Sequence, residues 1–229
     1  MSNILVIGAN STVAKEVFNL LQKENHTIYS VSRDDFDFSK NHLRTSLDEK
    51  EIDWDFFPEE INQLYYFPGT INLKPLKFLK EEDFKNDFEI NVLGFVRYIK
   101  KLEKNLRKGK ASVVSFTSVA SSIGMDYHTS VSASKGALES LNKALAAEFI
   151  GSVRFNTISL SLSNTNMAQQ LLNSDKKLEL AKSRNPMGVI GDPAKIAKLA
   201  TFVNSEACDW VTAQNIHVDG GMSNIKLFT

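Results

Sequence analysis

The stretch NILVIGANSTVA, residues 3–14, places a continuous apolar run directly before a glycine and a short polar turn. A run without alternation, at residues 3–9, indicates a strand that is buried on both faces of a sheet. Ser11 and Thr12 then suit the N-terminus of a helix. The following residues place an apolar stripe on one side of that helix, at Val13, Val17, Leu20 and Leu21. The stretch therefore predicts a strand, a tight turn and a helix, the opening unit of a parallel α/β sheet.

Strand-like and helix-like segments alternate along the rest of the chain. Further strands are expected at residues 26–32, 61–67, 111–118, 152–160 and 215–219. A third strand is expected within residues 34–50, near Phe36–Phe38 or near Leu43–Leu47, after a connection too short for a full crossover helix. Helices are expected at about residues 81–108, at 130–149, and from Asp192-Pro193 to about Asn204. This order predicts one α/β domain over residues 1–229, a Rossmann-like, doubly wound parallel sheet of about seven strands with helices on both faces.

The composition is that of an ordinary soluble protein and excludes several functional classes. The formal net charge is zero, so bulk electrostatics favours neither nucleic acid nor a membrane surface as a partner. No apolar run approaches the ~20 residues of a membrane span, and the N-terminus has no basic leader. The single cysteine, Cys208, fits a reducing compartment, so we expect a cytoplasmic protein. The four histidines are scattered without ligand spacing, so no metal site is expected.

The turn GANSTVA, residues 8–14, lies where a doubly wound sheet binds the pyrophosphate of a dinucleotide. Of the three glycines in the usual fingerprint only Gly8 is present, and Thr12 and Ala14 occupy the later positions. The hydroxyls of this turn and the Asn10 amide can donate to phosphate instead. The candidate cofactor-binding residues of the turn are Gly8, Asn10, Ser11, Thr12 and Val13. The same pattern is equally compatible with a capped turn that binds nothing.

Arg33 ends the second predicted strand, 25 residues after Gly8. A ribose contact is expected at this position: an acidic residue holds a 2′-hydroxyl, whereas an arginine accommodates a 2′-phosphate. Arg33 therefore favours NADP over NAD. The alternative is that Arg33 pairs with the neighbouring Asp34 and Asp35 on a solvated loop.

Several motifs now coincide in order and spacing. They are the Gly8 turn, FEINVLGF with Asn91, SFTSVAS with Ser118, SASKGAL with Lys135, NTISLSLSNTNM after the sixth strand, and TAQNIHVDGG at residues 212–221. Together they resemble the short-chain dehydrogenase/reductase family over essentially the whole chain. The resemblance implies a seven-stranded Rossmann-like fold, a bound NAD(P), and oxidation or reduction of a small-molecule alcohol or carbonyl.

The resemblance also implies roles for individual residues. Asn91 would position a water in a proton relay, and Ser118 would hydrogen-bond the substrate carbonyl. Lys135 would bind the nicotinamide ribose and lower the pKa of a catalytic tyrosine. Phe67 and Gly69 occupy part of the segment where the family has Asn-Asn-Ala-Gly, and only the glycine is retained. Thr165 fits the family's threonine that contacts the carboxamide of the cofactor.

The catalytic tyrosine of the family is absent, because its expected position is Val131. Valine cannot transfer a proton, so three interpretations remain open. Tyr127, beside His128 in GMDYHTS, can act as a substitute acid, or both can be ordinary loop residues. The chain can instead bind cofactor without catalysis, as a sensor or partner subunit. It can also be a scaffold without cofactor, although retention of Ser118, Lys135 and Asn91 argues against this.

Each retained residue has a structural alternative as well. Ser118 can cap a strand end, Asn91 can bond a helix kink, and Lys135 can extend its ammonium to water. The residues from 161 to Arg184 carry Met167, Leu171 and Leu172 and suggest a modestly apolar lid over the substrate. The broad apolar faces of the helices at 81–108 and 130–149 suggest, by the same resemblance, a homodimer or homotetramer.

Overall fold

The computed structural model describes residues 1–227, and its centre is one sheet of seven strands. All neighbouring strands are parallel, in the order β3-β2-β1-β4-β5-β6-β7. The strands are β1 (Asn3–Ile7), β2 (Thr27–Ser32), β3 (Asn41–Arg44), β4 (Gln63–Tyr66), β5 (Ser112–Ser118), β6 (Arg154–Leu160) and β7 (Asn215–Val218). This confirms the predicted doubly wound parallel sheet, in which the strand order reverses between β1 and β4.

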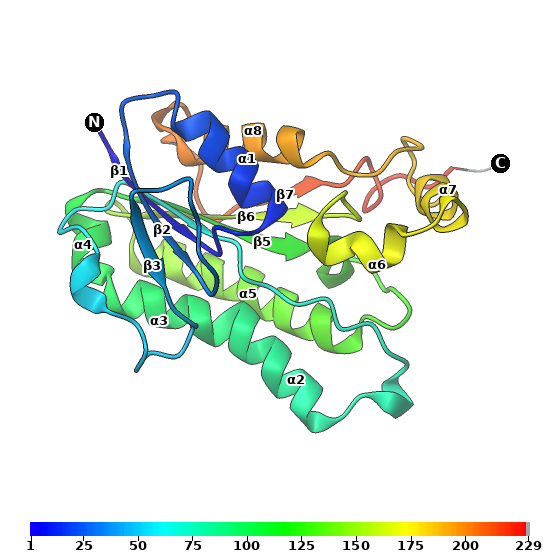
Figure 1. The fold of residues 1–229 in the computed structure, drawn as a ribbon. Helices are drawn as coiled ribbons and strands as arrows, with labels where there is room; N and C mark the ends of the chain where they lie inside the picture. The colour runs from blue at the N-terminus through cyan, green and yellow to red at the C-terminus, as the bar shows by residue number, and fades with distance from the viewer. Residues whose placement is uncertain (228–229) are drawn as a thin grey trace.

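Helices cover both faces of the sheet (Figure 1). On one face lie α1 (Thr12–Leu21) and α8 (Pro193–Asn204); on the other lie α3 (Gly94–Lys101) and α5 (Thr129–Glu148). Because side chains alternate along a strand, Ile4 and Val6 pack with the first pair of helices, whereas Leu5 and Ile7 pack with the second. The unbroken apolar run at the start of the chain thus contributes side chains to the hydrophobic cores on both faces of the sheet.

The third strand lies within residues 34–50, as expected, and close to the second of the two predicted positions. β3 begins at Asn41, before Leu43–Leu47, and only overlaps that range. The alternative at Phe36–Phe38 is wrong: these rings pack edge-on against Phe18 of α1, at centroid distances of 5.3 and 6.3 Å. No helix lies between β2 and β3 in the described chain, in agreement with the short connection. Aromatic rings fill the space that a crossover helix would otherwise cover.

The long helix predicted at residues 81–108 is interrupted. It consists of α2 (Glu81–Phe88), a π-helical turn η3 (Glu89–Leu93), α3 and, after a bend at Leu102, α4 (Glu103–Lys108). The Tyr66 hydroxyl donates a 2.7 Å hydrogen bond to the Ile90 carbonyl inside the π turn. A side chain at Gly94 would lie 2.6 Å from that hydroxyl. The phenol therefore enters the helix backbone, and the wider turn accommodates it.

The other helices follow the predicted pattern more closely. α5 matches the helix expected at 130–149, and α8 begins at Pro193 after Asp192, whose carboxylate accepts a 2.9 Å hydrogen bond from the Ala194 N–H. Two short helices were not predicted, α6 (Gln169–Leu172) and α7 (Asp175–Ser183). Both lie beyond the carboxyl ends of the strands (Figure 1). Short 3-10 turns complete the chain: η1 (Trp54–Phe56), η2 (Leu76–Phe78), η4 (Val119–Ser121), η5 (Asn166–Ala168) and η6 (Glu206–Cys208).

Candidate active site

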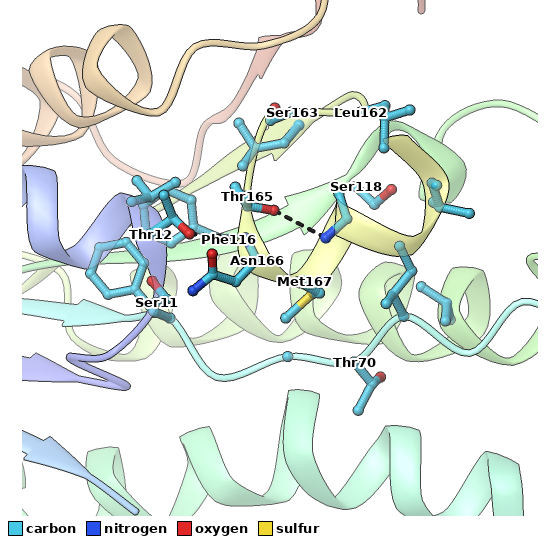
Figure 2. A pocket seen from close by; sticks show the side chains of 18 of the residues that line it. Ser11, Thr12, Thr70, Phe116, Ser118, Leu162, Ser163, Thr165, Asn166 and Met167 are labelled. Carbon is cyan, nitrogen blue, oxygen red and sulfur yellow. Dashed lines mark hydrogen bonds between the residues drawn. The ribbon is translucent and has the colours of Figure 1, made fainter. Parts of the chain in front are cut away.

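The carboxyl ends of the central strands open into a cavity of about 1540 Å³ (Figure 2). Pockets for one small molecule usually measure ~300–1,000 Å³, so this cavity has room for a large ligand beside a small one. It lies at the switch point between β1 and β4, where sheets of this type bind nucleotides. Of the predicted site residues, twelve line it: Gly8, Asn10, Ser11, Thr12, Val13, Arg33, Phe67, Gly69, Ser118, Tyr127, Lys135 and Thr165. Asn91 lies behind Gly69 instead.

The turn after β1 requires its glycine for two reasons. Gly8 has φ +79°, in the left-handed region that favours glycine, and a Cβ there would lie 2.9 Å from Pro68 Cδ. The Gly8 N–H donates a 2.8 Å bond to the Val31 carbonyl, which ties the turn to β2. Ser11 caps α1, since its hydroxyl oxygen accepts from the Ala14 N–H at 3.1 Å. The N-terminus of α1, at Thr12 and Val13, is therefore presented to the cavity, and it favours an anion.

The polar side chains of this turn are engaged within the protein. Asn10 Nδ2 lies 3.1 Å from Ser32 Oγ, 3.3 Å from the Asp34 carbonyl and 3.2 Å from the Asp35 carbonyl. Its two hydrogens therefore hold the end of β2, and a direct bond from Asn10 to phosphate would require this network to rearrange. Thr12 Oγ1 accepts a 3.0 Å bond from the Asn166 N–H, which links the turn to the segment after β6.

Arg33 lies exposed at the rim of the cavity and has no hydrogen bond or ion pair through its side chain among residues 1–227. Asp35 instead pairs with Arg44, at 3.5 Å. Arg44 also donates from Nε to the Arg33 carbonyl at 3.1 Å, which holds the backbone of the loop. The Arg33 guanidinium is therefore available to an anion that enters the cavity.

Phe67 forms part of the cavity wall where the family resemblance implies an asparagine. Its ring stacks on Phe116 at a centroid distance of 4.5 Å and an interplanar angle of 19°. Both residues line the cavity. Stacked rings offer an apolar surface rather than hydrogen bonds, so recognition at this wall depends on flat, apolar contact.

Lys135 points from α5 into a buried position beside Gly69. Its Nζ donates a 2.9 Å hydrogen bond to the Phe116 carbonyl, and only 7% of the residue is exposed. A side chain at Gly69 would place its Cβ 3.0 Å from Lys135 Nζ and 3.3 Å from Asn91 Oδ1. Glycine at position 69 thus keeps open the space that the ammonium and the amide oxygen face. Burial lowers the pKa of Lys135 to about 8, and the Asp87 carboxylate partly opposes this effect.

Asn91 belongs to the π turn, and its amide nitrogen lies near three oxygen atoms although it carries two hydrogens. Nδ2 lies 2.8 Å from the Asp87 carbonyl, 2.9 Å from Thr70 Oγ1 and 3.1 Å from Ser134 Oγ. Its Oδ1 is buried and has no donor within the described chain. An amide held in this way is a fixed acceptor aimed at the space beside Gly69, which suits a bridging water or a ligand hydroxyl. Asn91 also bonds the kinked helix, as its structural alternative predicted.

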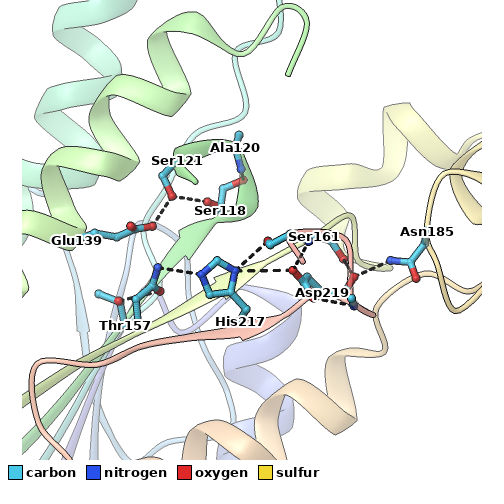
Figure 3. Close-up of polar contacts among 12 residues, drawn as sticks. Ser118, Ala120, Ser121, Glu139, Thr157, Ser161, Asn185, His217 and Asp219 are labelled. Carbon is cyan, nitrogen blue, oxygen red and sulfur yellow. Dashed lines mark hydrogen bonds and ion pairs between the residues drawn. The ribbon is translucent and has the colours of Figure 1, made fainter. Parts of the chain in front are cut away.

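Ser118 ends β5 and has both a structural role and a free hydrogen. Its Oγ accepts from the Ala120 N–H at 3.2 Å, and its own hydroxyl hydrogen has no acceptor among the described residues. Its carbonyl accepts a 2.5 Å bond from Ser121 Oγ, which also contacts the Glu139 carboxyl group (Figure 3). The hydroxyl of Ser118 is therefore positioned by its neighbours and can donate into the cavity.

Val131 lies buried in the cavity wall, with 4% of the residue exposed, and brings no proton donor there. Tyr127 and His128 line the mouth of the same cavity. Tyr127 is 57% exposed, and its hydroxyl has no hydrogen-bond partner within the described chain. Its backbone has φ +67°, a strained value for a bulky residue, and the Lys74 N–H holds its carbonyl at 3.1 Å. The strain indicates a loop held in one conformation by its surroundings.

The segment after β6 covers the cavity. Thr165 caps η5, with its Oγ1 accepting from the Ala168 N–H at 3.3 Å (Figure 2). Met167 and Leu171 line the cavity together with Leu180, whereas Leu172 does not, so that part of the predicted lid is wrong. The sequence signal for α7 was present at Ser174, whose hydroxyl caps the helix, but the charged helix carries no apolar stripe.

The VDGG motif joins this cover to the sheet. The Asp219 carbonyl accepts from Asn185 Nδ2 at 2.7 Å and from Ser161 Oγ at 3.2 Å (Figure 3). A side chain at Gly220 would lie 2.3 Å from Asn185 Oδ1, so glycine lets Asn185 approach the backbone. Asn185 was not predicted as a site residue, because its role becomes visible only once the two segments meet.

Metal-binding and membrane-spanning features are both missing from the described part of the chain. Among residues 1–227, His, Cys, Asp and Glu side chains nowhere gather in groups of three that could hold a metal ion. Over the same residues, each helix is too short or too polar to span a bilayer.

A doubly wound parallel sheet with a glycine turn and a cavity at the switch point is the architecture of Rossmann-like folds. The family profile described as enoyl-(acyl carrier protein) reductase matches residues 60–223. The chain belongs to the short-chain dehydrogenase/reductase family of oxidoreductases.

Individual relatives agree with this assignment. The 3-oxoacyl-(acyl-carrier-protein) reductase FabG of Thermotoga maritima is 26% identical over 243 residues, covering 95% of this chain and 96% of that protein. Tropinone reductase homologs of Arabidopsis thaliana match at 28% to 30% identity, and the chain spans 55% to 65% of their length.

Solved structures agree as well. A short chain dehydrogenase family protein from Francisella tularensis superimposes with a TM-score of 0.91 at 25% identity, covering 97% of this chain and 99% of that one. The 3-ketoacyl-(acyl-carrier-protein) reductase of Brucella melitensis, complexed with NADH, shares the fold with a TM-score of 0.85 at 19% identity, covering 97% of this chain and 98% of that one.

Proposed function

We propose that this protein binds NADP(H) in the cavity and uses it to interconvert a carbonyl and an alcohol on a small, largely apolar molecule. The observation that carries the proposal is the buried Lys135 ammonium beside Gly69, facing the unpartnered Asn91 Oδ1 at one end of the cavity. A glycine turn and a helix N-terminus line the same cavity. Together these features support a site for one extended dinucleotide.

The residues present fit this cofactor. Gly8 and the N-terminus of α1 would hold the pyrophosphate, and the free Arg33 guanidinium would hold a 2′-phosphate, which is why NADP is favoured over NAD. Lys135 would hold the nicotinamide ribose and Thr165 the carboxamide. When bound, NADP(H) supplies or accepts the hydride. A relative of the same fold is complexed with NADH, which supports the cofactor class.

Three side chains would act on the substrate. The free Ser118 hydrogen would donate to the carbonyl oxygen and fix its position. Lys135 provides a positive charge at this end of the cavity, which favours a developing oxyanion. Val131 cannot donate the proton, so another residue must. Tyr127 lines the cavity and lies four residues before Val131 in the chain, and its phenol is the candidate donor. General acid catalysis of this kind contributes ~10²–10⁴-fold.

The lining of the cavity supports an apolar substrate. Several segments contribute apolar side chains to it: Ile71, Leu73, Met125, Leu162, Met167, Leu171, Leu180 and Val189. We also propose that the protein is cytoplasmic. It would form a homodimer or homotetramer through α2, η3 and α5. There a groove lined by Phe84, Phe88, Leu93 and Ala133 leaves apolar side chains unburied, with Phe88 41% and Leu93 40% exposed.

A second candidate function is favoured by Val131. A protein that retains Ser118, Lys135 and Asn91 but no phenol at position 131 can bind the cofactor without turnover, as a sensor or partner subunit. This function predicts cofactor affinity and no reductase activity. Restoring the phenol would then create activity that the natural protein lacks.

The two functions are separated by the Val131→Tyr and Tyr127→Phe variants, assayed with NADPH on a panel of ketones. We expect the natural protein to reduce at least one ketone and the Tyr127→Phe variant to lose roughly 10²-fold or more in rate, because the substitute acid is removed. Activity that arises only in Val131→Tyr would contradict catalysis by the natural protein and establish the sensor. Equal rates in natural protein and Tyr127→Phe would eliminate Tyr127 as the acid.

A further inference from the structure

Asp87 is a buried carboxyl group without a role in the proposed reaction. It lies on α2, one helical turn before Asn91, and only 2% of the residue is exposed. Its Oδ2 is buried and has no hydrogen-bond donor within the described chain. Its backbone carbonyl accepts the 2.8 Å bond from Asn91 Nδ2, so it belongs to the same cluster as the candidate relay residue. A carboxylate in such a position is costly unless another charge compensates it.

Lys135 presents the complementary case. Its ammonium is buried, and the single hydrogen bond it donates within the described chain goes to the neutral Phe116 carbonyl. Asn91 connects the two residues: Nδ2 contacts the Asp87 carbonyl and Ser134 Oγ, while Oδ1 faces the space where Lys135 Nζ lies. Asp87 and Lys135 are thus both buried where α2, η3 and α5 pack together, and neither forms an ion pair among residues 1–227.

We propose that Asp87 is the buried counter-charge of Lys135, a positioning residue that keeps the Lys135 side chain in its ammonium form beside the cofactor site. The role for the reaction rests on the proposed function, whereas the charge pairing does not. Asp87 does not line the cavity, so it acts through Lys135 rather than on substrate. The favourable effect of Asp87 on the protonated lysine, which opposes the lowering of the Lys135 pKa by burial, agrees with this pairing.

The other ionisable groups near Lys135 are engaged elsewhere or exposed. On α5, Glu139 contacts Ser121; on η3, Glu89 pairs with Arg97. From the loop before α5, Asp126, Tyr127 and His128 lie at the exposed mouth of the cavity, and from the cover come Lys177 and Arg184. β4, β5 and the loop after β4 bring no carboxylate to the cavity lining within residues 1–227. Asp87 is therefore the carboxylate placed to balance this ammonium.

The test is a pH titration of Lys135 by NMR, on cofactor-free protein labelled with ¹³C at the lysine Cε carbons. Lys135→Met identifies the resonance. We expect a midpoint near pH 8 in the natural protein. In Asp87→Asn we expect the midpoint to fall by about one pH unit or more, because an opposite charge nearby stabilises the ammonium. Asp87→Val should shift it in the same direction. This second variant removes the charge without leaving a polar side chain in the buried position.

Glu82→Gln is the matched control, because Glu82 is an exposed carboxylate on the same helix. Its midpoint should equal that of the natural protein. An unchanged midpoint in both Asp87 variants would overturn the proposal, as would an equal shift in Glu82→Gln. Because no cofactor is present, failure of NADPH to bind in a separate titration would count against the proposed function alone.

Discussion

At the scale of single residues, Lys135 is a strongly constrained position. Its ammonium is buried, donates to one backbone carbonyl and requires glycine at position 69 for space. These demands cost stability, and a position under selection for stability alone would more readily hold an apolar residue. The arrangement is therefore typical of a functional site.

This cost makes a prediction about pH. The pKa of Lys135 is lowered by burial from 10.5 to about 8, so between these values the unfolded chain binds the proton more tightly and stability rises with pH. Below pH 8 the destabilisation is fully present, and above 10.5 it is gone. Between pH 7 and pH 10 the natural protein should therefore gain about 2–3 kcal/mol relative to Lys135→Met.

The measurement is urea unfolding of both proteins across that range. Other lysines and tyrosines titrate in both, so their contributions cancel in the difference. Parallel pH profiles would contradict the lowered Lys135 pKa.

Residues with a strong local motif could be predicted from sequence, and those defined by tertiary contact could not. The SASKGAL and SFTSVAS motifs identified Lys135 and Ser118, and both line the cavity. Asp87 and Thr70 gave no signal, because an aspartate or a threonine is ordinary in sequence and becomes informative only when it is found buried against Asn91.

At the scale of elements, the helices that cross the sheet are shaped by what packs against them. The connection from α4 to β5 shows this at Gly109. Its φ is not in the left-handed region, so the glycine is not required for a turn. A Cβ there would lie 2.0 Å from the Ile61 carbonyl oxygen, and backbone cannot move away cheaply. The helix end is thus fitted directly against the segment before β4.

We expect Gly109→Ala to destabilise the protein by roughly 3 kcal/mol, because two backbone segments must separate. Gly124→Ala is the matched control, since a Cβ at that position would meet no atom of another segment within 4 Å and its φ is ordinary. The control should remain within about 0.5 kcal/mol of the natural protein in thermal or urea unfolding. Similar losses in both variants would show that close packing at Ile61 is not the cause.

Element boundaries were predictable where capping chemistry is local. Asp192-Pro193 gave the start of α8, because the cap and the first-turn proline act within one turn. The π turn at Glu89–Leu93 was not predictable, since it depends on the Tyr66 hydroxyl reaching Ile90 from a strand far along the chain. The sequence left two positions open for β3, because Asn41–Arg44 lacks an apolar run and pairs with β2 on one side alone.

At the scale of the whole molecule, the strand order explains why distant motifs meet. β1 and β4 pair at the centre of the sheet, and the chain continues from β1 toward β2 but from β4 toward β5 (Figure 1). The turns that follow β1 and β4 both line the cavity. The glycine turn and Lys135 lie far apart in sequence, yet both line this cavity. The proposed cofactor site is therefore assembled by the strand order, and Val131 is one of many residues that line it.

Calorimetric titration of the natural protein with NADPH and with NADH tests this most directly. We expect NADPH to bind, and to bind more tightly than NADH. Arg33→Ala should reduce NADPH affinity by roughly tenfold to a hundredfold, the effect of losing a hydrogen bond to a charged group, and leave NADH affinity unchanged. Lys40→Ala, at an exposed position on the same loop, should change neither affinity. Absence of detectable heat with both nucleotides at millimolar concentration would contradict a cofactor site in this cavity.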